Sequence, residues 1–230
     1  MHDKRDRLVD RVTLEGYQDP LKVPGHVAKY VSYDRAIVHQ RLAELFPKGS
    51  QLLALGEGAA LDAEFLAERG RQVLVTDASA GLLRSAEERT SSSGARSNLR
   101  FLRHILPLNF PPEIKPDSLD GVYSIACLMH LRGRGVEKVL LNVARVLKPD
   151  GAFYFTFPEA RDDLDDNGRD VNGRFYNCWN RSEWLQAVER VNARLASTDV
   201  HLVQDGLVDE LGDLGGRPGV KFCGLCLKKK

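Results

Sequence analysis

The feature that most constrains this chain is a regular alternation, from Leu52 onward, of short apolar runs with segments of helical periodicity. The runs have the length and composition of buried strands, and apolar residues three or four apart follow most of them. The predicted strands cover residues 52–55, 73–75, 99–102, 119–125 and 152–157. Strands joined through single helices pair in parallel by right-handed crossovers. The sequence therefore predicts an α/β fold with a doubly wound, mostly parallel sheet.

Further segments extend this core at both ends. Residues 35–46 carry apolar residues at helical spacing and predict an amphipathic helix before the first strand. After the fifth strand, Ser182 is placed to cap a helix. Residues 200–203 and 220–227 predict two closing strands, including a closing antiparallel strand.

Composition and length suit a single globular domain. The 230 residues are 43% hydrophobic and 28% charged, and 33 basic side chains nearly balance 32 acidic ones. A protein whose main ligand is a nucleic-acid backbone usually has a basic excess, so this balance disfavours nucleic acid as the partner. The charged N-terminus lacks the apolar core of a signal peptide, and no apolar run is long enough to span a membrane. With four scattered cysteines, we expect a cytoplasmic protein with reduced thiols.

Small and acidic residues stand where the predicted strands end. Gly56 and Gly58 follow the first strand and let the backbone approach a ligand without interference from a Cβ. Asp77 ends the second strand, about twenty residues further on, where a carboxylate can accept both hydroxyls of a ribose. Ser124 lies at the same edge of the fourth strand. Ligands of open parallel sheets bind at this edge, so the pattern predicts a ligand that contains a nucleoside.

Two such ligands are a dinucleotide and S-adenosylmethionine. A dinucleotide-binding fingerprint needs a third glycine where Leu61 stands, because the helix packs closely on the strand there. Leucine is too large for that packing, which favours S-adenosylmethionine.

Six segments occur in an order and at a spacing that one enzyme family shares. They are 52–60 (LLALGEGAA), 73–79 (VLVTDAS), 118–124 (SLDGVYS), 144–152 (ARVLKPDGA), 173–176 (GRFY) and 182–185 (SEWL). The first resembles the glycine motif of class I S-adenosylmethionine-dependent methyltransferases, and the second their ribose-binding segment. The third and fourth are similar to their fourth strand and to the turn before their fifth strand. The last two resemble a segment that members acting on small molecules carry after the fifth strand. The resemblance covers roughly residues 35–228.

This resemblance implies an enzyme that uses S-adenosylmethionine to methylate an oxygen or nitrogen nucleophile of a small-molecule substrate. It implies that residues 35–230 form the methyltransferase domain and that residues 1–34 form an N-terminal lid or edge segment. The cofactor contacts it implies are Gly56, Glu57, Gly58, Asp77, Ala78, His104, Ile105 and Ser124.

The chain departs from the family pattern in three places. The acidic residue usual at position 54 is Ala54, and the third glycine of the motif is Ala60. Glu57 is a candidate to replace the missing carboxylate. The third strand ends near His104 rather than in the usual aspartate, so His104 or the Ile105 backbone is expected to meet the adenine. These departures leave a catalytically weakened binding or scaffold subunit as an alternative.

Four aromatic or basic residues are expected to bind the substrate, and one histidine to act on it. His130, just after the fourth strand, lies where the family places residues that face the transferred methyl, and a neutral imidazole is a suitable general base. The alternative is a histidine that packs on the following helix. The substrate-binding candidates are Tyr30, Tyr33, Arg174 and Tyr176, and His26 and Trp179 are expected near them. Alternatively, Arg174 pairs with the acidic loop 162–166.

The remaining motifs predict little chemistry. Segment 124–127 (SIAC) lacks the turn of base amino-methyltransferases and a Pro-Cys nucleophile, although a tRNA or protein substrate stays an alternative. Cys223 and Cys226 are spaced like a metal or redox pair, but on a strand they would face opposite sides. We therefore expect no metal site. Lys228, Lys229 and Lys230 are expected to form a solvated tail.

Overall fold

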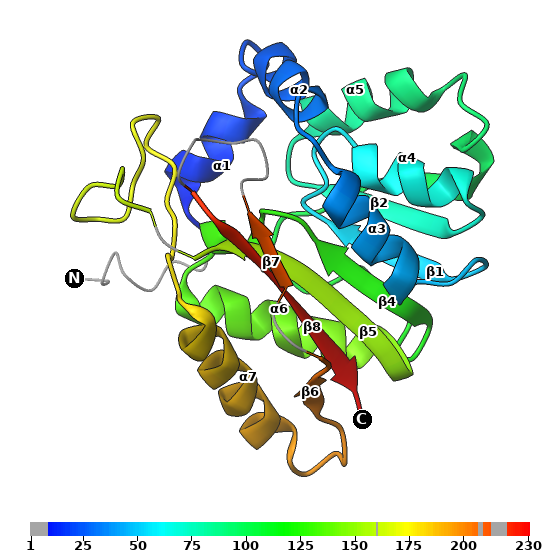
Figure 1. Cartoon of the computed structure of the whole chain (residues 1–230), viewed down its shortest axis with the longest axis vertical. Helices are drawn as coiled ribbons and strands as arrows, with labels where there is room; N and C mark the ends of the chain where they lie inside the picture. The colour runs from blue at the N-terminus through cyan, green and yellow to red at the C-terminus, as the bar shows by residue number, and fades with distance from the viewer. Residues whose placement is uncertain (1–8, 160, 207–208, 213–219) are drawn as a thin grey trace.

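The described residues of the protein, 9–159, 161–206, 209–212 and 220–230 of a computed structural model, contain a central sheet of eight strands (Figure 1). Its order is β3-β2-β1-β4-β5-β8-β6, and β7 also pairs with β8. The strands are β1 (Gln51–Leu55), β2 (Gln72–Asp77), β3 (Leu99–Arg103), β4 (Leu119–Ser124), β5 (Leu147–Pro158), β6 (Leu202–Gln204), β7 (Asp209–Gly212) and β8 (Phe222–Lys229).

The direction of the strands confirms the predicted fold class. The pairs β3·β2, β2·β1, β1·β4 and β4·β5 are parallel, whereas β8 runs antiparallel to β5, β6 and β7. The chain builds β1, β2 and β3 outward to one side and then returns to place β4 on the other side of β1. The crevice at this reversal is where open α/β sheets bind their ligands.

Helices cover both faces of the sheet. They are α1 (Arg11–Gln18), α2 (Val23–Val31), α3 (Ala36–Leu45), α4 (Leu61–Glu68), α5 (Ala80–Thr90), α6 (Gly133–Val146) and α7 (Arg181–Leu195). One face carries α3, α4 and α5, and the other carries α6 and α7 (Figure 1). Successive residues of β1 serve the two layers in turn: Leu53 and Leu55 pack in the cluster with α6 and α7, and Leu52 and Ala54 in the cluster with α3 and α4. This alternation follows from the two-residue period of a strand.

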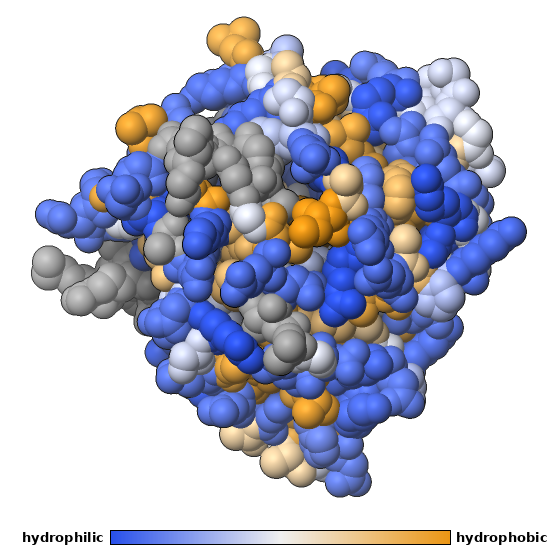
Figure 2. Space-filling view, in the orientation of Figure 1, coloured by the Kyte–Doolittle hydropathy of each residue, from blue (hydrophilic) through white to orange (hydrophobic). Residues whose placement is uncertain are grey.

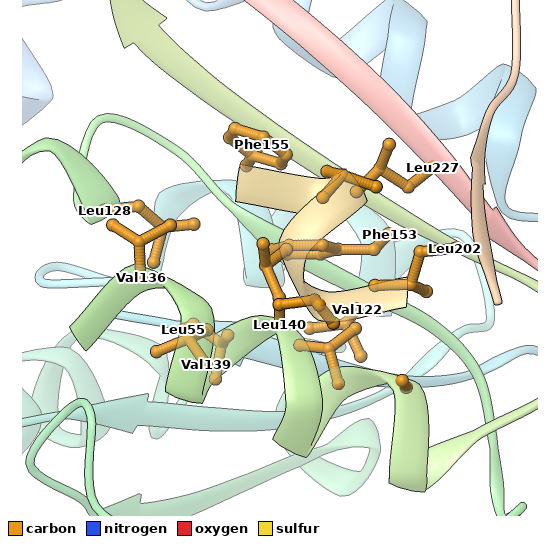
Figure 3. Close-up of a cluster of buried hydrophobic side chains, with 14 of the residues drawn as sticks. Leu55, Val122, Leu128, Val136, Val139, Leu140, Phe153, Phe155, Leu202 and Leu227 are labelled. Carbon is orange, nitrogen blue, oxygen red and sulfur yellow. The ribbon is translucent and has the colours of Figure 1, made fainter. Parts of the chain in front are cut away.

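The larger cluster shows how the apolar periodicity of α6 becomes a packed core. Val136, Val139 and Leu140, which recur at helical spacing, are fully buried in one cluster with Leu55, Leu128 and Phe153 (Figure 3). Trp184 of α7 closes the cluster, with its ring centroid 5.0 Å from that of Phe155. Full burial of each such aliphatic side chain contributes about 1.5–3 kcal/mol to folding.

Helices α1 and α2 lie in the N-terminal segment, to which the sequence assigned no secondary structure. Asp10 caps α1, because its carboxylate accepts a hydrogen bond from the Thr13 amide at 3.0 Å. In α2 a proline stands in the first turn, where its missing amide hydrogen leaves no bond unmade. Both helices lie beyond the carboxyl ends of the parallel strands (Figure 1).

Two local predictions are wrong, and one strand was missed. Asn180, not Ser182, caps α7, and Glu183 completes the capping box by accepting from the Asn180 amide at 2.8 Å. Segment 148–151, predicted as a turn, belongs to β5, where Asp150 takes a positive φ of 63° and the pairing with β4 shifts its register. Strand β7 was not predicted at all.

The prediction of a solvated lysine tail is also wrong for Lys229. Strand β8 continues to Lys229, whose side chain is buried and donates to the Leu147 carbonyl at 2.8 Å as well as to Asp117. Lys228, on the opposite side of the strand, forms a partly exposed ion pair with Asp205. A buried ammonium therefore closes the end of the sheet.

Apolar side chains on the surface are few and scattered. The face in Figure 2 is mainly hydrophilic, with separate hydrophobic areas between charged side chains. The large exposed apolar residues are Val12, Leu21, Val31, Ile37, Leu108, Val171 and Val203. Single residues of this kind are ordinary on a soluble surface. Within the part of the chain that the structure describes, no helix is long and apolar enough to cross a membrane.

The two neighbouring lysines provide a matched test of this end of the sheet. We expect Lys229→Ala to lower the free energy of unfolding by about 2 kcal/mol, because the buried Leu147 carbonyl loses its partner. Lys228→Ala removes an exposed pair and should cost less than about 1 kcal/mol. Urea unfolding of both variants measures the difference, and equal losses would contradict the assigned role of Lys229.

Candidate active site

A cavity of about 240 Å³ lies at the carboxyl ends of β1, β2 and β4. Its wall combines the loops after these strands with α1, α2 and the loop after β5. All the predicted site residues except Ser124 line it: Tyr30, Tyr33, Gly56, Glu57, Gly58, Asp77, Ala78, His104, Ile105, His130, Arg174 and Tyr176. Residues more than 140 positions apart in the sequence thus share one site, as the position of the strand ends predicts.

The loop after β1 keeps a left-handed backbone throughout its turn. Gly56, Gly58 and Ala60 have φ values of 65°, 59° and 58°. Ala60 therefore adopts the conformation of the glycine it replaces, which costs an alanine roughly 1–2 kcal/mol. At Gly56 a Cβ would overlap the Cys127 thiol, and at Gly58 it would lie 2.9 Å from Cε2 of Tyr30. The loop is thus packed between Cys127 and Tyr30, and its first two glycines leave no room for a side chain.

Asp77 holds this loop against the end of β2. One carboxylate oxygen accepts from the Gly58 amide at 2.9 Å, and the other accepts from the Ser79 amide at 2.8 Å. Ser79 in turn caps α5 by accepting from the Leu82 amide. Burial raises the pKa of Asp77, whereas the backbone hydrogen bonds oppose that shift. A carboxylate has about four acceptor positions, so these two bonds leave Asp77 able to accept more.

The partly buried Glu57 and the buried Asp62 form a carboxyl pair beside the glycine loop. Glu57 caps α4, because one of its oxygens accepts from the amides of Asp62 and Ala63 at 3.1 and 3.0 Å. Asp62 accepts from Arg35 at 2.5 Å and contacts His39 at 3.0 Å. Burial and then the Asp62 charge raise the pKa of Glu57 well above its ordinary value. Burial also acts on Asp62, but Arg35 and His39 leave its pKa below the ordinary value, so Asp62 is the more acidic of the pair.

Three nitrogens around this cavity suit a polar ligand. His26 Nε2, Arg35 Nε and His104 Nε2 are buried and have no hydrogen-bond partner among the described residues. An unpaired buried polar atom costs about 1–3 kcal/mol, which a ligand with matching polar groups removes. S-adenosylmethionine carries an adenine edge, ribose hydroxyls and a charged methionine end. The Asp77 carboxylate, the open backbone of the glycine loop and these nitrogens therefore fit that cofactor.

His130 lies at the other end of the cavity in a hydrogen-bond chain. Its Nδ1 is 2.7 Å from the Phe175 carbonyl, which can only accept, so Nδ1 carries the proton. Its Nε2 therefore accepts from the Tyr17 hydroxyl at 3.1 Å. Arg174 donates to Tyr17 at 3.2 Å and is fixed by two bonds to the buried Asp170. Burial is the main cause that lowers the pKa of His130 to about 4, so its ring is neutral near pH 7.

Helix α1 and the loop after β5 close the cavity together. Asp10 accepts from Arg169 at 2.7 and 3.1 Å and from Arg132 at 3.4 Å. The Phe175 amide donates to the Thr13 hydroxyl at 2.8 Å. Burial would raise the pKa of Asp10, but the bonds to Arg169 and Thr13 lower it to about 2. The contact between helix and loop therefore stays charged at any ordinary pH.

Some sequence-based expectations are not met at this site. Ser124 does not line the cavity, because its hydroxyl donates to the buried Leu55 carbonyl at 3.0 Å. Arg174 pairs with Asp170 rather than with the acidic loop 162–166. Trp179 packs against Trp184, with ring centroids 5.1 Å apart, and does not line the cavity.

Neither the two cysteines of β8 nor Cys127 of the cavity is placed for cysteine chemistry. Cys223 and Cys226 lie in the two opposite core clusters, as the strand period predicts. Cys127 lines the cavity, but burial raises the pKa of its thiol to about 12. A thiol with that pKa is protonated at neutral pH, so Cys127 is a packing residue rather than a nucleophile.

Several solved structures share this fold. A TehB-like methyltransferase from Corynebacterium glutamicum is 20% identical with a TM-score of 0.66, and the match covers 92% of this chain and all of that one. The [4+2]-cyclase SpnF is 13% identical with a TM-score of 0.68, over 96% of this chain and 97% of its own. A third is the 1,6-didemethyltoxoflavin-N1-methyltransferase of Burkholderia thailandensis, solved with 1,6-didemethyltoxoflavin and S-adenosylhomocysteine. It is 20% identical with a TM-score of 0.62, and the match covers 94% of this chain and 85% of that one. Because one of these is named as a cyclase, the fold alone does not give the reaction.

The sequence signature decides the family. The family model of the methyltransferase domain matches residues 52–151, from the first buried strand to the turn within β5. Over residues 52–151 the chain therefore carries a methyltransferase domain, and its fold is that of S-adenosylmethionine-dependent methyltransferases. S-adenosylmethionine is accordingly its cofactor, as the motifs predicted. The search of curated proteins gave no match.

The sequence missed several polar residues of the methyltransferase site. Tyr17, Asp10 and Arg35 all line the cavity, and two of them lie before the first predicted helix. Asp10 stands three residues before Thr13, a spacing that could have indicated a helix cap. Nothing local in the sequence indicates that Tyr17 meets His130, because that contact joins residues 113 positions apart.

The glycine loop gives a direct test of its packing. We expect Gly56→Ala to lower the free energy of unfolding of the methyltransferase by about 2–4 kcal/mol, through left-handed strain and overlap with Cys127. Gly94→Ala is the matched control, since a Cβ there meets nothing within 4 Å. Thermal and urea unfolding measure both variants. Equal stabilities would show that the loop is not packed as described.

His130 should make stability depend on pH. Its pKa is about 4 in the folded protein and 6.5 ordinarily, so the unfolded chain binds more protons between these values. Stability should therefore fall as the pH drops from 6.5 to 4, by up to about 3 kcal/mol from this residue. Unfolding free energies measured across that range should fall less steeply for His130→Gln. Parallel profiles for the two proteins would contradict the buried neutral ring.

Proposed function

We propose that this methyltransferase methylates an oxygen or nitrogen atom of a small-molecule substrate. The observation that carries the proposal is the closure of the His130 end of the cavity by α1 and the loop after β5. Asp10, Thr13 and Tyr17 of the N-terminal segment each bond to that loop, at Arg169, Phe175 and Arg174. A macromolecular substrate would have to displace all three contacts, whereas a small molecule fits behind them.

We assign residues 9–34 to a lid on this basis and residues 35–230 to the methyltransferase domain. Tyr30 packs on the Gly58 backbone, so it belongs to the cofactor side of the lid rather than to the substrate side alone. The acceptor side consists of the rings and the guanidinium nearest His130, which are Tyr17, Arg174 and Tyr176. Tyr33, whose ring centroid is 6.4 Å from that of Tyr30, lies farther along the same wall.

We assign the cofactor contacts on the geometry at the strand ends. Asp77 is placed to accept from the ribose hydroxyls, and Ala78 continues the same wall. His104 Nε2 and the Ile105 segment are placed for the adenine. The backbone of the loop from Gly56 to Gly58, with Arg35 beside it, is placed for the methionine end. Glu57 acts through α4, since it fixes the start of that helix next to the loop.

Methyl transfer asks little covalent chemistry of the protein. The cofactor supplies an electrophilic methyl group on its sulfonium. The chain must align the acceptor with that methyl and exclude water, which the closed lid provides. An oxygen or nitrogen acceptor must also lose a proton, and the neutral His130 ring is the base we assign to that step.

Calorimetric titration with S-adenosylmethionine and S-adenosylhomocysteine tests the cofactor binding on which the proposal depends. We expect micromolar binding of both, and a loss of about 10–100-fold in affinity for Asp77→Asn, which removes a charged acceptor. Asp120→Asn is the matched control, because Asp120 bonds to Gln51 and Lys148 and does not line the cavity. No binding to the wild-type chain at millimolar ligand would refute the function. Equal losses for the two variants would refute the role of Asp77.

A further inference from the structure

The Tyr17 hydroxyl stands between two groups that make it more than a packing residue. It donates its proton to His130 Nε2 and accepts from Arg174, and Tyr30 is a further side-chain hydrogen-bond partner. Burial raises the pKa of Tyr17 above its ordinary value, so the hydroxyl is protonated at neutral pH. In this arrangement His130 Nε2 is already occupied, and an acceptor cannot reach it without displacing Tyr17.

The arginines of the cavity wall are already paired with carboxylates. Arg174 makes two bonds to Asp170, at 2.8 and 2.5 Å. Arg161 makes two bonds to Asp163, at 2.8 and 2.6 Å, and Arg35 is bound to Asp62. The one lysine of the wall, Lys29, lies over the Tyr33 ring, 5.8 Å from its centroid. An anionic acceptor near Tyr17 would therefore meet arginines whose charge a carboxylate already balances, which favours a neutral acceptor.

Aromatic rings surround the hydroxyl. The Tyr17 ring centroid lies 5.1 Å from that of His26 and 5.5 Å from that of His130, and the Tyr176 ring is 4.6 Å from His130. Contacts at this spacing are typical of rings that pack edge to face or offset. A planar acceptor fits such a wall better than a flexible polar one.

We propose that Tyr17 and His130 form a two-step proton relay for a neutral, planar acceptor that carries a proton on the atom to be methylated. A phenol hydroxyl and a heteroaromatic N–H are the two acceptor groups of this class. The inference rests on the proposed function. In it Tyr17 contacts the acceptor, and His130 receives the proton that Tyr17 passes on.

The proton and electron balance of the step is simple. As the acceptor atom bonds to the methyl carbon, the sulfonium–methyl bond breaks and its electron pair stays on sulfur. The acceptor proton passes to Tyr17 Oη while the Tyr17 proton passes to His130 Nε2, which becomes positively charged. The hydrogen bond from Arg174 holds the Tyr17 oxygen in place during the exchange. The imidazolium returns its proton to solvent after the product leaves.

The groups that face the pair set its response to pH. They are Arg161, Asp170, Arg174 and Tyr176 from the loop after β5, His26 and Tyr30 from α2 and Cys127 from the end of β4. Because the His130 pKa is about 4, its ring is unprotonated throughout the neutral range, which is the state that the relay needs. We expect kcat/KM to stay flat from pH 8 to about pH 5, with no loss near the ordinary histidine pKa of about 6.5.

The first measurement does not depend on turnover. In the complex with S-adenosylhomocysteine at pH 7, nitrogen NMR should show His130 neutral with the proton on Nδ1. Tyr17→Phe should shift the Nε2 resonance, because that nitrogen loses its hydrogen bond. A charged ring, a proton on Nε2, or no shift in the variant would each overturn the relay.

The second measurement uses S-adenosylmethionine with two sets of probes. Neutral phenols and heteroaromatic N–H compounds are compared with analogues that carry a carboxylate or whose reactive atom has no proton, and released S-adenosylhomocysteine is measured. We expect turnover of the first set, and a fall of kcat for Tyr17→Phe of about 10²-fold with little change in the KM for the cofactor. Tyr123→Phe removes a buried hydroxyl outside the cavity wall and should keep the wild-type kcat.

The outcomes separate this inference from the proposed function. If the protein binds no S-adenosylmethionine, or methylates no probe of either set, the proposed function and the relay are both refuted. A chain that binds the cofactor but methylates only charged or proton-free probes refutes the relay alone. Full kcat in Tyr17→Phe, or a fall limited to its KM, refutes it as well and leaves Tyr17 as a positioning residue.

Discussion

The site depends on the Asp77 carboxylate and the two backbone amides that it holds. Its oxygens join the Gly58 amide of one loop to the Ser79 amide of the next, so the ends of β1 and β2 are fixed relative to each other. Cys127 and Tyr30 pack on the same glycine loop from the end of β4 and from α2. The cofactor end of the cavity is therefore built around one acidic side chain. Ser79, whose amide donates to that side chain, also caps α5.

Burial has opposite consequences at the two ends of this cavity. Near the cofactor loop, Arg35 and His39 keep Asp62 acidic while Glu57 is pushed toward its neutral form. Near the acceptor, burial keeps His130 uncharged. Desolvation penalises any charge without a partner, so the charges that persist are those held in pairs. This leaves a cavity wall with many ionisable groups and little unbalanced charge.

Much of the sheet and of the cofactor end could be predicted from the sequence, because both depend on local patterns. Strand length and helical periodicity lie within single segments and are confirmed by the sheet order, and Gly56, Gly58 and Asp77 line one cavity at the strand ends. The acceptor end could not be predicted in the same way. Its central contacts join Tyr17 to His130 and to Arg174 across more than a hundred positions, and helix α1 is only 8 residues long. Lys229 was mistaken for a tail residue because its partners, Asp117 and Leu147, are equally remote.

The cavity combines a central span of the chain with flanking segments. The glycine loop, Asp77 and His130 lie within residues 52–151, whereas α1, α2 and the loop carrying Arg174 lie outside that span. Substrate choice can therefore change by exchange or drift of the outer segments while the inner scaffold keeps its sequence. The practical consequence is modularity: a transplanted N-terminal segment must bring its matching loop, since Asp10, Thr13 and Tyr17 each need a counterpart there.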